Sequence, residues 1–427
     1  MSGVGIVLYL ILNGVDMPLD NFNDENEKRH YSTDSLKDIL QSVIDRKATV
    51  ADFVAPTTAL QQRTTVLEGG GVRTDVIREA DGGVPTAVLE ANPVARQQIA
   101  SKANIESRTA ERLRANYPVQ YDGLINAIWQ KEPKKVMLRT YEHNAAEHDS
   151  MVRAGRLGVA TLVSSNTGVL RALMSDKYKT FDNDHLLEAV VPTLRDSEAQ
   201  WKVVKASITD QKMVIRFKSD VITGSGAQVN DVMAHGIGIS NSETGHGSVS
   251  VFEILWTLFC LNGMQTQKKS RSAHLTSSRS DSDTWAMLTD QSKQLDNQAL
   301  SSKLRDISAG YASRESFDES CERMRSAAGD VIEGDGQAAV EALGGVLKLS
   351  KSETSSVLAG LLLTVGQPGY AGQPVSRATL VNAVTQAAHK APLDNVDEWQ
   401  NLGGRVLDLP ANQWATVSQA GVDRVAA

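Results

Sequence analysis

A polar turn, residues 241–247, lies between two short apolar segments and dictates how this part of the chain can fold. Residues 232–240 and 248–252 carry β-branched and other apolar side chains, and the turn between them contains Gly245 and Gly247. Two apolar runs separated by a glycine-containing polar turn predict a β-hairpin. One of the two glycines is expected to adopt a positive φ, because glycine enters that region without a Cβ penalty.

The chain beyond this hairpin is nearly continuous in large apolar residues. Residues 253–261 therefore predict a buried helix. Asn262-Gly263 follows directly and is typical of a tight turn. The positions expected to build turns are Asn241, Gly245, Gly247, Asn262 and Gly263.

The order of strand and helix patterns predicts an α+β fold, with a central, mostly antiparallel sheet, flanking helices and a helical C-terminal region. The expected divisions are a disordered or mis-annotated N-terminus (1–33), a helical and hairpin region (34–132), a central α+β domain (133–265), a basic loop (266–283) and a helical C-terminal region (284–427).

Composition excludes several classes of protein. A chain of 427 residues with a net charge of −7 has no global basic field, so any anion site must be a local patch. The two cysteines, Cys260 and Cys321, form no Cys-x-x-Cys pair, which argues against a cysteine zinc site and for a reducing, cytoplasmic compartment. An apolar run at residues 4–12 is too short to span a membrane, so translation is expected to start at Met17.

The strongest local basic patch begins just after the Asn-Gly turn. Its cationic residues alternate with hydroxyl residues and contain no acid among them, which suits contacts to phosphate oxygens. A solvated loop would have the same composition. The cations of this patch are Lys268, Lys269, Arg271 and Arg279.

A second group of basic residues lies in the predicted central sheet. Arg216 and Lys218 share one face of a predicted strand through its period of two, and Arg171 precedes them in the chain. Together they could form a cationic stripe, with Tyr141, Tyr178 and Trp201 as stacking surfaces for bases. The alternative is ordinary surface charge with the aromatic rings in the core.

Signatures of enzymes and cofactors are missing from the sequence. It contains no Walker A loop, no Gly-x-Ser-x-Gly elbow and no complete dinucleotide fingerprint. His143 and His148 lie five residues apart, a spacing that does not place both rings on one helix face. His235 and His246 flank the hairpin turn and could bracket an anion, although a role in stabilising the turn explains them as well. No catalytic residue, metal or cofactor is therefore expected.

Several short motifs resemble those of the phage/plasmid-like family that carries the domain of unknown function 932. The hairpin turn matches an Asn-Ser-(Glu/Asp)-x-Gly motif, and residues 260–264 match Cys-x-Asn-Gly-Met. Upstream, residues 171–178 match Arg-Ala-x-x-Ser-x-x-Tyr and are followed by Asp182-Asn183. Residues 403–410 with Trp414 match the closing Gly-Gly-x-x-Leu-x-Leu-Pro…Trp motif, so the resemblance covers roughly residues 138–414.

This resemblance implies a protein encoded by a bacteriophage, plasmid or other mobile element, and it loosely suggests DNA replication or recombination. It supplies no catalytic residues. The sequence therefore leads to the hypothesis of a non-enzymatic DNA-binding protein that prefers single-stranded DNA, in the host cytoplasm, without membrane association and with oligomers possible. The alternative is a structural or regulatory protein that binds a phage or host protein through the helical C-terminal region.

Overall fold

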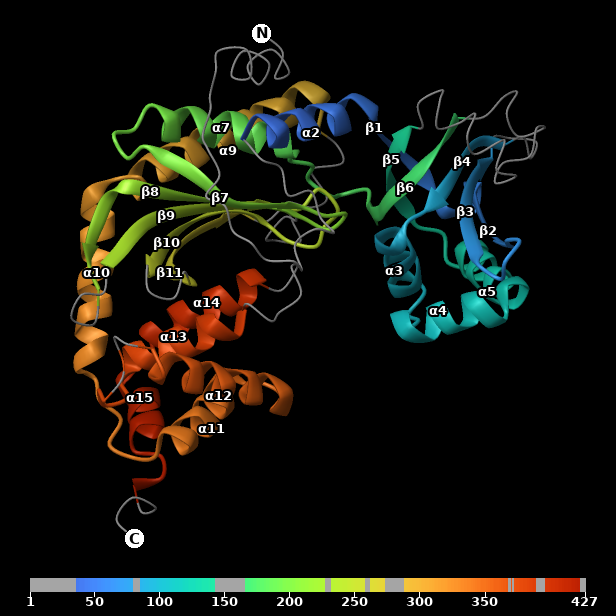
Figure 1. Ribbon diagram of the computed structural model, residues 1–427. Helices are drawn as coiled ribbons and strands as arrows, with labels where there is room; N and C mark the ends of the chain where they lie inside the picture. The colour runs from blue at the N-terminus through green and yellow to red at the C-terminus, as the bar shows by residue number, and fades with distance from the viewer. Residues whose placement is uncertain are drawn as a thin grey trace.

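The computed structural model describes residues 36–79, 85–142, 166–226, 232–257, 262–272, 288–367, 370, 372–388 and 396–422. Figure 1 shows two lobes side by side. The first lobe contains β1 to β6, and the second contains β7 to β11 with most of the helices. The α+β class and the helical C-terminal region predicted from the sequence are confirmed, with the strands divided between two sheets.

The first lobe is a six-stranded mixed sheet in the order β1-β5-β6-β4-β3-β2, in which only the β4–β6 pair is parallel. Its apolar core lies between the sheet and helices α3 and α5. The strands are β1 (Val50–Pro56), β2 (Leu60–Val66), β3 (Val72–Glu79), β4 (Pro85–Ala91), β5 (Lys135–Glu142) and β6 (Asn166–Ser175). The 3-10 turn Thr57–Ala59 follows β1, and the helices are α3 (Pro93–Lys102), α4 (Ser107–Asn116) and α5 (Pro118–Lys131).

This sheet crosses the boundary expected near residue 132. Strands β5 and β6 pair with β1 and β4, so the region expected to be a separate helical and hairpin unit needs residues from the expected central domain to complete its sheet. The sequence signal was local, whereas β1 and β5 are brought together from positions about 85 residues apart, as in the pair Ala55↔Val136.

The outer edge of β2 is covered by side chains of α5. The Asn126 side-chain amide accepts a hydrogen bond from Gln62 N at 2.7 Å and donates one to Gln62 O at 2.9 Å. Asp122 accepts from the backbone N–H of Thr64. These side chains satisfy backbone groups that a neighbouring strand would otherwise pair.

The second lobe is an antiparallel sheet in the order β11-β10-β9-β8-β7. Helices α2, α7 and α9 lie over one side of this sheet, whereas α13 and α14 lie near the other side and pack against β11 (Figure 1). The strands are β7 (Trp201–Ile208), β8 (Met213–Ser225), β9 (Val232–Asn241), β10 (Val249–Thr257) and β11 (Asn262–Ser272), and the three helices are α2 (Leu36–Thr49), α7 (Asn183–Arg195) and α9 (Asp290–Tyr311).

The C-terminal helices begin at side-chain caps. Ser313, Asp335, Ser350 and Ser376 each accept a hydrogen bond from a backbone N–H in the first turn of the helix that follows. Such caps satisfy donors that the helix itself leaves unpaired. The helices of this region are α10 (Arg314–Gly329), α11 (Gly336–Leu347), α12 (Lys351–Val365), α13 (Arg377–Ala387), α14 (Val396–Leu407) and α15 (Ala411–Ser418). The buried Cys321 belongs to the core they share with the sheet.

The predicted hairpin is confirmed, and its second strand is longer than expected. β9 and β10 pair antiparallel from Ser240↔Ser250 to Met233↔Thr257. The prediction of a helix over residues 253–261 is wrong at least as far as Thr257, because this segment continues β10. All of β10 is buried on both faces, so its apolar run is continuous and lacks the alternation that marks a half-exposed strand.

Two glycines of β9 make room for aromatic rings of β10. A Cβ added at Gly238 would lie 2.0 Å from Phe252 Cε2, and one at Gly236 would lie 2.2 Å from Trp256 Nε1. Both distances are far below van der Waals contact. The alternation of glycine and isoleucine in β9 therefore places the bulky isoleucines on one face and the two rings over the glycines on the other.

The turn glycines also behave as the sequence predicts. Gly245 has a φ of +80°, which is the left-handed region expected for one of the two glycines. Asn262 and Gly263, in contrast, form the first residues of β11 instead of a turn. The connection between β10 and β11 lies at residues 258–261, outside the described residues.

In the part of the chain that the structure describes, none of the helices has the length and apolar character needed to span a lipid bilayer.

Replacing Gly245 with valine should lower the free energy of unfolding by about 1–3 kcal/mol, because a β-branched residue is strained at positive φ. Gly247 in the same turn is the matched control, since its φ is ordinary and an added Cβ meets only Ser242 Cβ at 3.7 Å. Chemical denaturation of both variants measures the difference. Equal stabilities for the Gly245→Val and Gly247→Val proteins would contradict the assignment.

Replacing Gly238 with alanine should also destabilise the protein, by about 1–3 kcal/mol, because the Phe252 ring must move in a packed core. Gly310, near the end of α9, has no atom within 4 Å of an added Cβ. Gly310→Ala should therefore be neutral or stabilising by up to about 1 kcal/mol through helix propensity. Thermal melts of the two variants measure these effects. A melting temperature of Gly238→Ala equal to that of the wild-type protein would show that the Phe252 ring does not need the space above Gly238.

Candidate functional site

Two of the motifs singled out in the sequence, residues 171–183 and the hairpin turn, meet at one buried ionic cluster between the two lobes. This cluster, called here the lobe junction, joins residues from both sheets and from the start of α7. Its charged members are Lys47 of α2, Asp52 of β1, Arg139 of β5, Arg171 of β6, Asp182 at the N-cap of α7, and Glu243 of the β9–β10 turn.

Arg139 lies at the centre of the lobe junction, with a side chain only 1% exposed. Its guanidinium binds Asp52 through two nitrogens, at 3.0 Å from Nε and 2.9 Å from Nη2. Nη2 also donates to Asp182 Oδ1 at 2.6 Å, and Nη1 donates to the carbonyl oxygen of Glu243 at 3.1 Å. One side chain of the first lobe thus binds its own sheet, the start of α7 and the hairpin turn, as the planar fork of arginine allows.

Glu243 gives the turn a second attachment to the first lobe. Its carboxylate forms an ion pair with the buried Arg171 and accepts a hydrogen bond from Asn183 N at 2.8 Å. The Arg171 guanidinium also lies over the ring of Tyr141, 5.0 Å from its centroid. Because Asn183 N belongs to the first turn of α7, the Glu243 carboxylate stabilises the positive end of that helix.

Neutral hydrogen bonds fix the backbone of the turn. Asn241 Nδ2 donates to Phe181 O at 2.8 Å and to Asn183 Oδ1 at 3.0 Å. Tyr178 Oη donates to Ser242 O at 3.0 Å, and Gln98 Nε2 donates to Thr244 O at 2.7 Å. The turn therefore has a buried polar partner on nearly every residue from 241 to 244.

The charges of the lobe junction shift one another's proton affinity. Burial alone would raise the pKa of Asp182, but the nearby Arg139 and Lys47 outweigh it and hold that pKa well below the usual carboxyl range. Burial opposes the charge on Arg139 as well, and Asp182 and Asp52 keep its pKa well above the ordinary value. Asp182 and Arg139 are therefore both charged at neutral pH, and each charge depends on the other.

The residues of the predicted cationic stripe are largely buried and do not form a surface for nucleic acid. Arg171 is 1% exposed and Arg216 is 3% exposed, so neither can contact a ligand in this structure, and Lys218 is largely buried beside Asp220. Tyr178 and Trp201 are also buried and offer no stacking surface. Period-two alternation placed Arg216 and Lys218 on one face correctly, but that face of the sheet is covered.

The predicted basic loop is in part an edge strand. β11 continues to Ser272, where Lys269 pairs with Phe252 and Arg271 with Ser250. Lys268, Lys269 and Arg271 therefore follow one another along the edge of the second sheet instead of a free loop. Arg279 lies outside the described residues, as do His143 and His148. His235 is fully buried in β9, whereas His246 is exposed in the turn.

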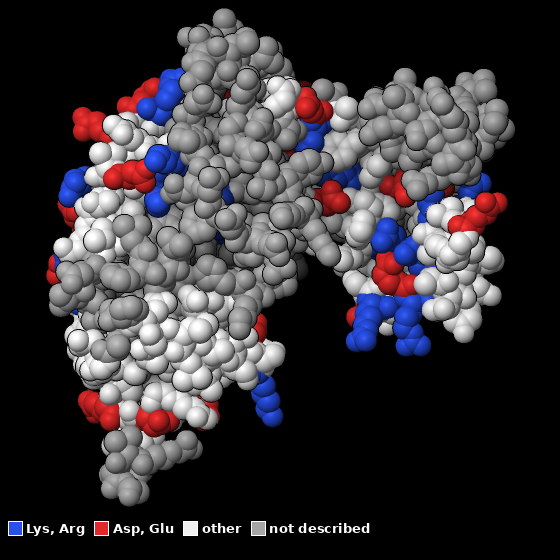
Figure 2. Space-filling view, in the orientation of Figure 1, with Lys and Arg blue, Asp and Glu red and all other residues white. Residues whose placement is uncertain are grey.

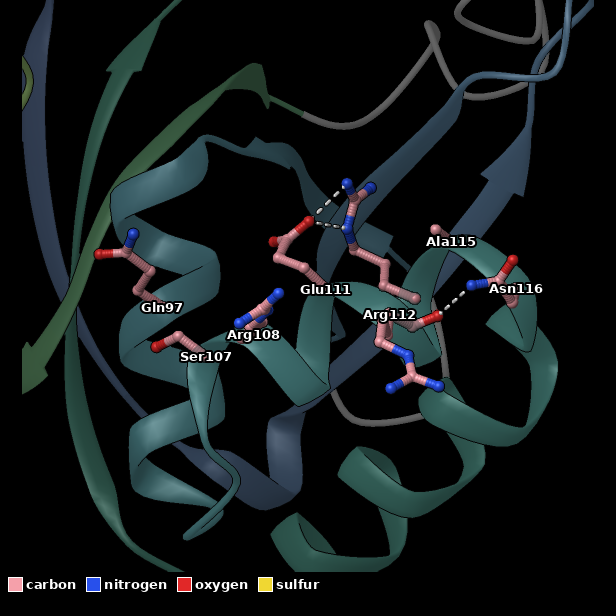
Figure 3. A pocket seen from close by; sticks show the side chains of 8 residues that line it. Gln97, Ser107, Arg108, Glu111, Arg112, Ala115 and Asn116 are labelled. Atoms are coloured by element: carbon pink, nitrogen blue, oxygen red, sulfur yellow. Dashed lines mark hydrogen bonds and ion pairs between the residues drawn. The ribbon is translucent and has the colours of Figure 1, made fainter.

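A cationic hollow that sequence reasoning missed lies along α4. Its volume is about 620 Å³, and Figure 3 shows Arg108 and Arg112 projecting from α4 around it. Arg114 pairs with Glu111 at 2.7 Å, and Arg96 pairs with the same carboxylate at 2.8 Å. Arg108 and Arg112 form no ion pair with any described residue. Figure 2 shows Lys and Arg side chains gathered at this end of the first lobe.

An exposed aromatic ring follows the hollow directly. Tyr117 comes after Asn116, which lines the hollow, and 58% of its surface is exposed. The sequence of α4 alternates charged and small residues and is typical of any solvated helix. Only the structure shows that Glu111 pairs with Arg96 and Arg114, and that Arg108 and Arg112 pair with no described acid.

The start of α7 also gathers side chains that could hold a metal ion. Asp182, Asp184 and His185 each offer one ligand atom, and these atoms lie within 4.8 Å of one another. Lys47 forms ion pairs with both aspartates of this group.

Comparison with known proteins gives no relative to set beside this geometry: scans against protein-family models, curated proteins and solved structures each returned no match. The family resemblance stays an interpretation of the motifs.

Replacing Arg139 with methionine should lower the free energy of unfolding by about 3–5 kcal/mol at neutral pH, because it leaves buried carboxylates without their partner. Since the folded-state pKa of Asp182 is depressed, its contribution is present above the ordinary carboxyl range and is lost as pH falls below that range. The cost of the substitution should therefore shrink in acid.

Denaturant titrations at neutral pH and near pH 3 measure this cost. Arg314→Met is the control, because Arg314 forms an exposed ion pair with Asp318 four residues on, worth only about 0.3–0.5 kcal/mol. A pH-independent loss in Arg139→Met, or one no larger than in the control, would show that the cluster does not stabilise the fold through charge.

Proposed function

We propose that this protein binds nucleic acid, single-stranded DNA in preference to duplex, as an accessory factor in the replication or recombination of a mobile element in the host cytoplasm. The observation that carries the proposal is the hollow along α4, where Arg108 and Arg112 form no ion pair with any described residue. The exposed Tyr117 comes directly after the lining residue Asn116 in the chain. The chain's net charge of −7 confines such binding to a local surface.

The two arginines have the spacing and freedom that phosphate binding needs. Arg108 and Arg112 are separated by one helical turn and lie on the same face of α4. Their guanidinium groups can each donate to phosphate oxygens, and Ser107, Gln97 and Asn116 line the same hollow with neutral donors. A positively charged surface with such donors tracks a sugar–phosphate backbone without reading base sequence.

Tyr117 favours a single strand over a duplex. An exposed ring at the end of the helix that carries the two arginines provides a face on which an unpaired base can stack, whereas the bases of a duplex are already stacked on each other. Of the rings that the sequence suggested for this role, Tyr178 and Trp201 are buried and Tyr141 lies partly buried under the Arg171 guanidinium, so Tyr117 takes their place in the proposal.

The edge strand β11 supplies a second possible contact. Lys268, Lys269 and Arg271 follow one another along this edge, and Arg279 comes after it in the chain. This cationic segment belongs to the second lobe and α4 to the first, so a strand of sufficient length could contact both.

A protein partner is the competing function, and one observation favours it. Leu362 and Leu363 near the end of α12 are 66% and 50% exposed. Two adjacent exposed leucines in a helical region suit an apolar contact with another protein.

A gel shift with single- and double-stranded DNA at several salt concentrations tests the proposal. Arg108→Ala/Arg112→Ala should weaken binding to single strands of any sequence and lower the log–log salt slope by about 1.4, since each phosphate contact on a single strand contributes about 0.7. Tyr117→Ala should cost about 1–3 kcal/mol of binding free energy, and Tyr117→Phe should keep it. The quadruple alanine variant of Lys268, Lys269, Arg271 and Arg279 tests β11 in the same way.

Lys303→Ala/Arg305→Ala is the matched control, because it removes two exposed cations from another helix, α9. It should leave both affinity and salt slope unchanged. No binding of wild-type protein to single-stranded DNA at low salt would reject the proposal in favour of a protein partner. Binding that survives in the α4 variant but not in the β11 variant would move the site to the second lobe.

A further inference from the structure

The first turn of α7 contains a buried carboxylate with one unpaired oxygen. The Asp184 side chain is 7% exposed, and its Oδ1 has no hydrogen-bond partner among the described residues. Its Oδ2 forms an ion pair with Lys47 Nζ at 3.7 Å, beyond hydrogen-bond distance. A buried carboxylate oxygen without a hydrogen bond is costly, because the water it has lost is not replaced. Such an oxygen points to a ligand.

The imidazole of His185 faces the same space. His185 Nδ1 is buried without a hydrogen-bond partner and lies 3.7 Å from Asp184 Oδ1. Two donor atoms that bind one metal ion at about 2.0–2.2 Å each lie up to about 4 Å apart. The separation of these two atoms therefore fits a single ion between them, and Asp182 offers a third atom within 4.8 Å.

A third carboxylate lies one helical turn further along α7. Glu188 Oε1 is also buried and has no hydrogen-bond partner among the described residues. Glu188 stands four residues from Asp184, so the two carboxylates share one face of α7 and add negative charge to it.

The cation now at this position is Lys47. Its ammonium pairs with Asp182 and Asp184, but its side chain is 33% exposed, so the flexible stem can turn outward into solvent. Lysine is a single positive charge on a long chain, whereas the surrounding acids are Asp182, Asp184 and Glu188. Arg139 balances Asp182 from the other side, so Lys47 is the cation that faces Asp184.

We propose that Asp182, Asp184 and His185 bind a divalent transition metal ion, Mn²⁺ or Zn²⁺, which replaces the Lys47 ammonium. A set of carboxylates with one imidazole suits these ions, whereas Mg²⁺ prefers oxygen ligands and keeps its waters. Because Asp182 also binds Arg139, the metal would join α7 to the lobe junction. This site is independent of the nucleic-acid proposal.

Calorimetric titration of the full-length protein with Mn²⁺, Zn²⁺ and Mg²⁺, together with thermal melts in each ion, tests the site. Wild-type protein should bind Mn²⁺ or Zn²⁺ and melt at a higher temperature with the ion, and Mg²⁺ should have a weaker effect. Asp184→Asn and His185→Gln should each weaken binding by at least about tenfold, the loss that follows even when an outer partner of a metal is removed. Asp196→Asn is the control, because Asp196 is an exposed carboxylate after α7 that pairs with Arg195. This variant should bind the metal ions as the wild-type protein does.

Lys47→Met gives a result that a purely structural role for these residues does not predict. Removing the competing ammonium should tighten metal binding by about tenfold, since one unit charge at about 4 Å contributes about 1 kcal/mol or more and 1.4 kcal/mol is tenfold. Thermal melts without metal show whether each variant folds. If Asp184→Asn does not fold, His185→Gln, at a partly exposed position, provides the test of metal binding. Failure of wild type to bind either ion, or equal binding by wild type, Asp184→Asn and His185→Gln, overturns the proposal. Neither readout involves DNA.

Discussion

A guanidinium without access to water determines how the two lobes meet. Arg139 is buried in the first sheet, and its donors reach Asp52 beside it, Asp182 at the start of α7 and the carbonyl of Glu243 in the hairpin turn. A buried charge must find partners, and these partners come from both lobes. This arrangement of the lobes satisfies Arg139, Arg171 and Glu243 together, through contacts that depend on direction. Apolar packing alone, being non-directional, would tolerate several.

How far the sequence predicts this arrangement depends on how local each signal is. The hairpin, the positive φ of Gly245 and the helices of the C-terminal region follow from patterns within a few residues of each other. The second half of β10 does not, because a strand buried on both faces has the composition of a buried helix. The family resemblance pointed to Arg171, Asp182 and Glu243, and these residues converge, but as a buried structural cluster and not as an exposed surface.

The arginines show most clearly where reasoning from sequence ends. Arg171 and Arg216 were predicted to bind DNA and are buried, whereas Arg108 and Arg112 were passed over, are exposed and form no ion pair with a described residue. The residue type is identical in both cases. What differs is burial, and Glu243, which pairs with Arg171, lies 72 residues from it along the chain. Burial by distant partners is a property of the fold, so no local pattern could separate the two pairs.

The amide of Asn126 has a consequence for the behaviour of the protein in a crowded cell. It pairs with both backbone groups of Gln62 on β2, as a residue of an adjacent strand would. A sheet edge left open is a template on which another chain can add a strand and begin an aggregate. With its amide in this position, α5 acts as a terminator of the sheet. The first lobe is therefore protected from recruiting its neighbours through that edge.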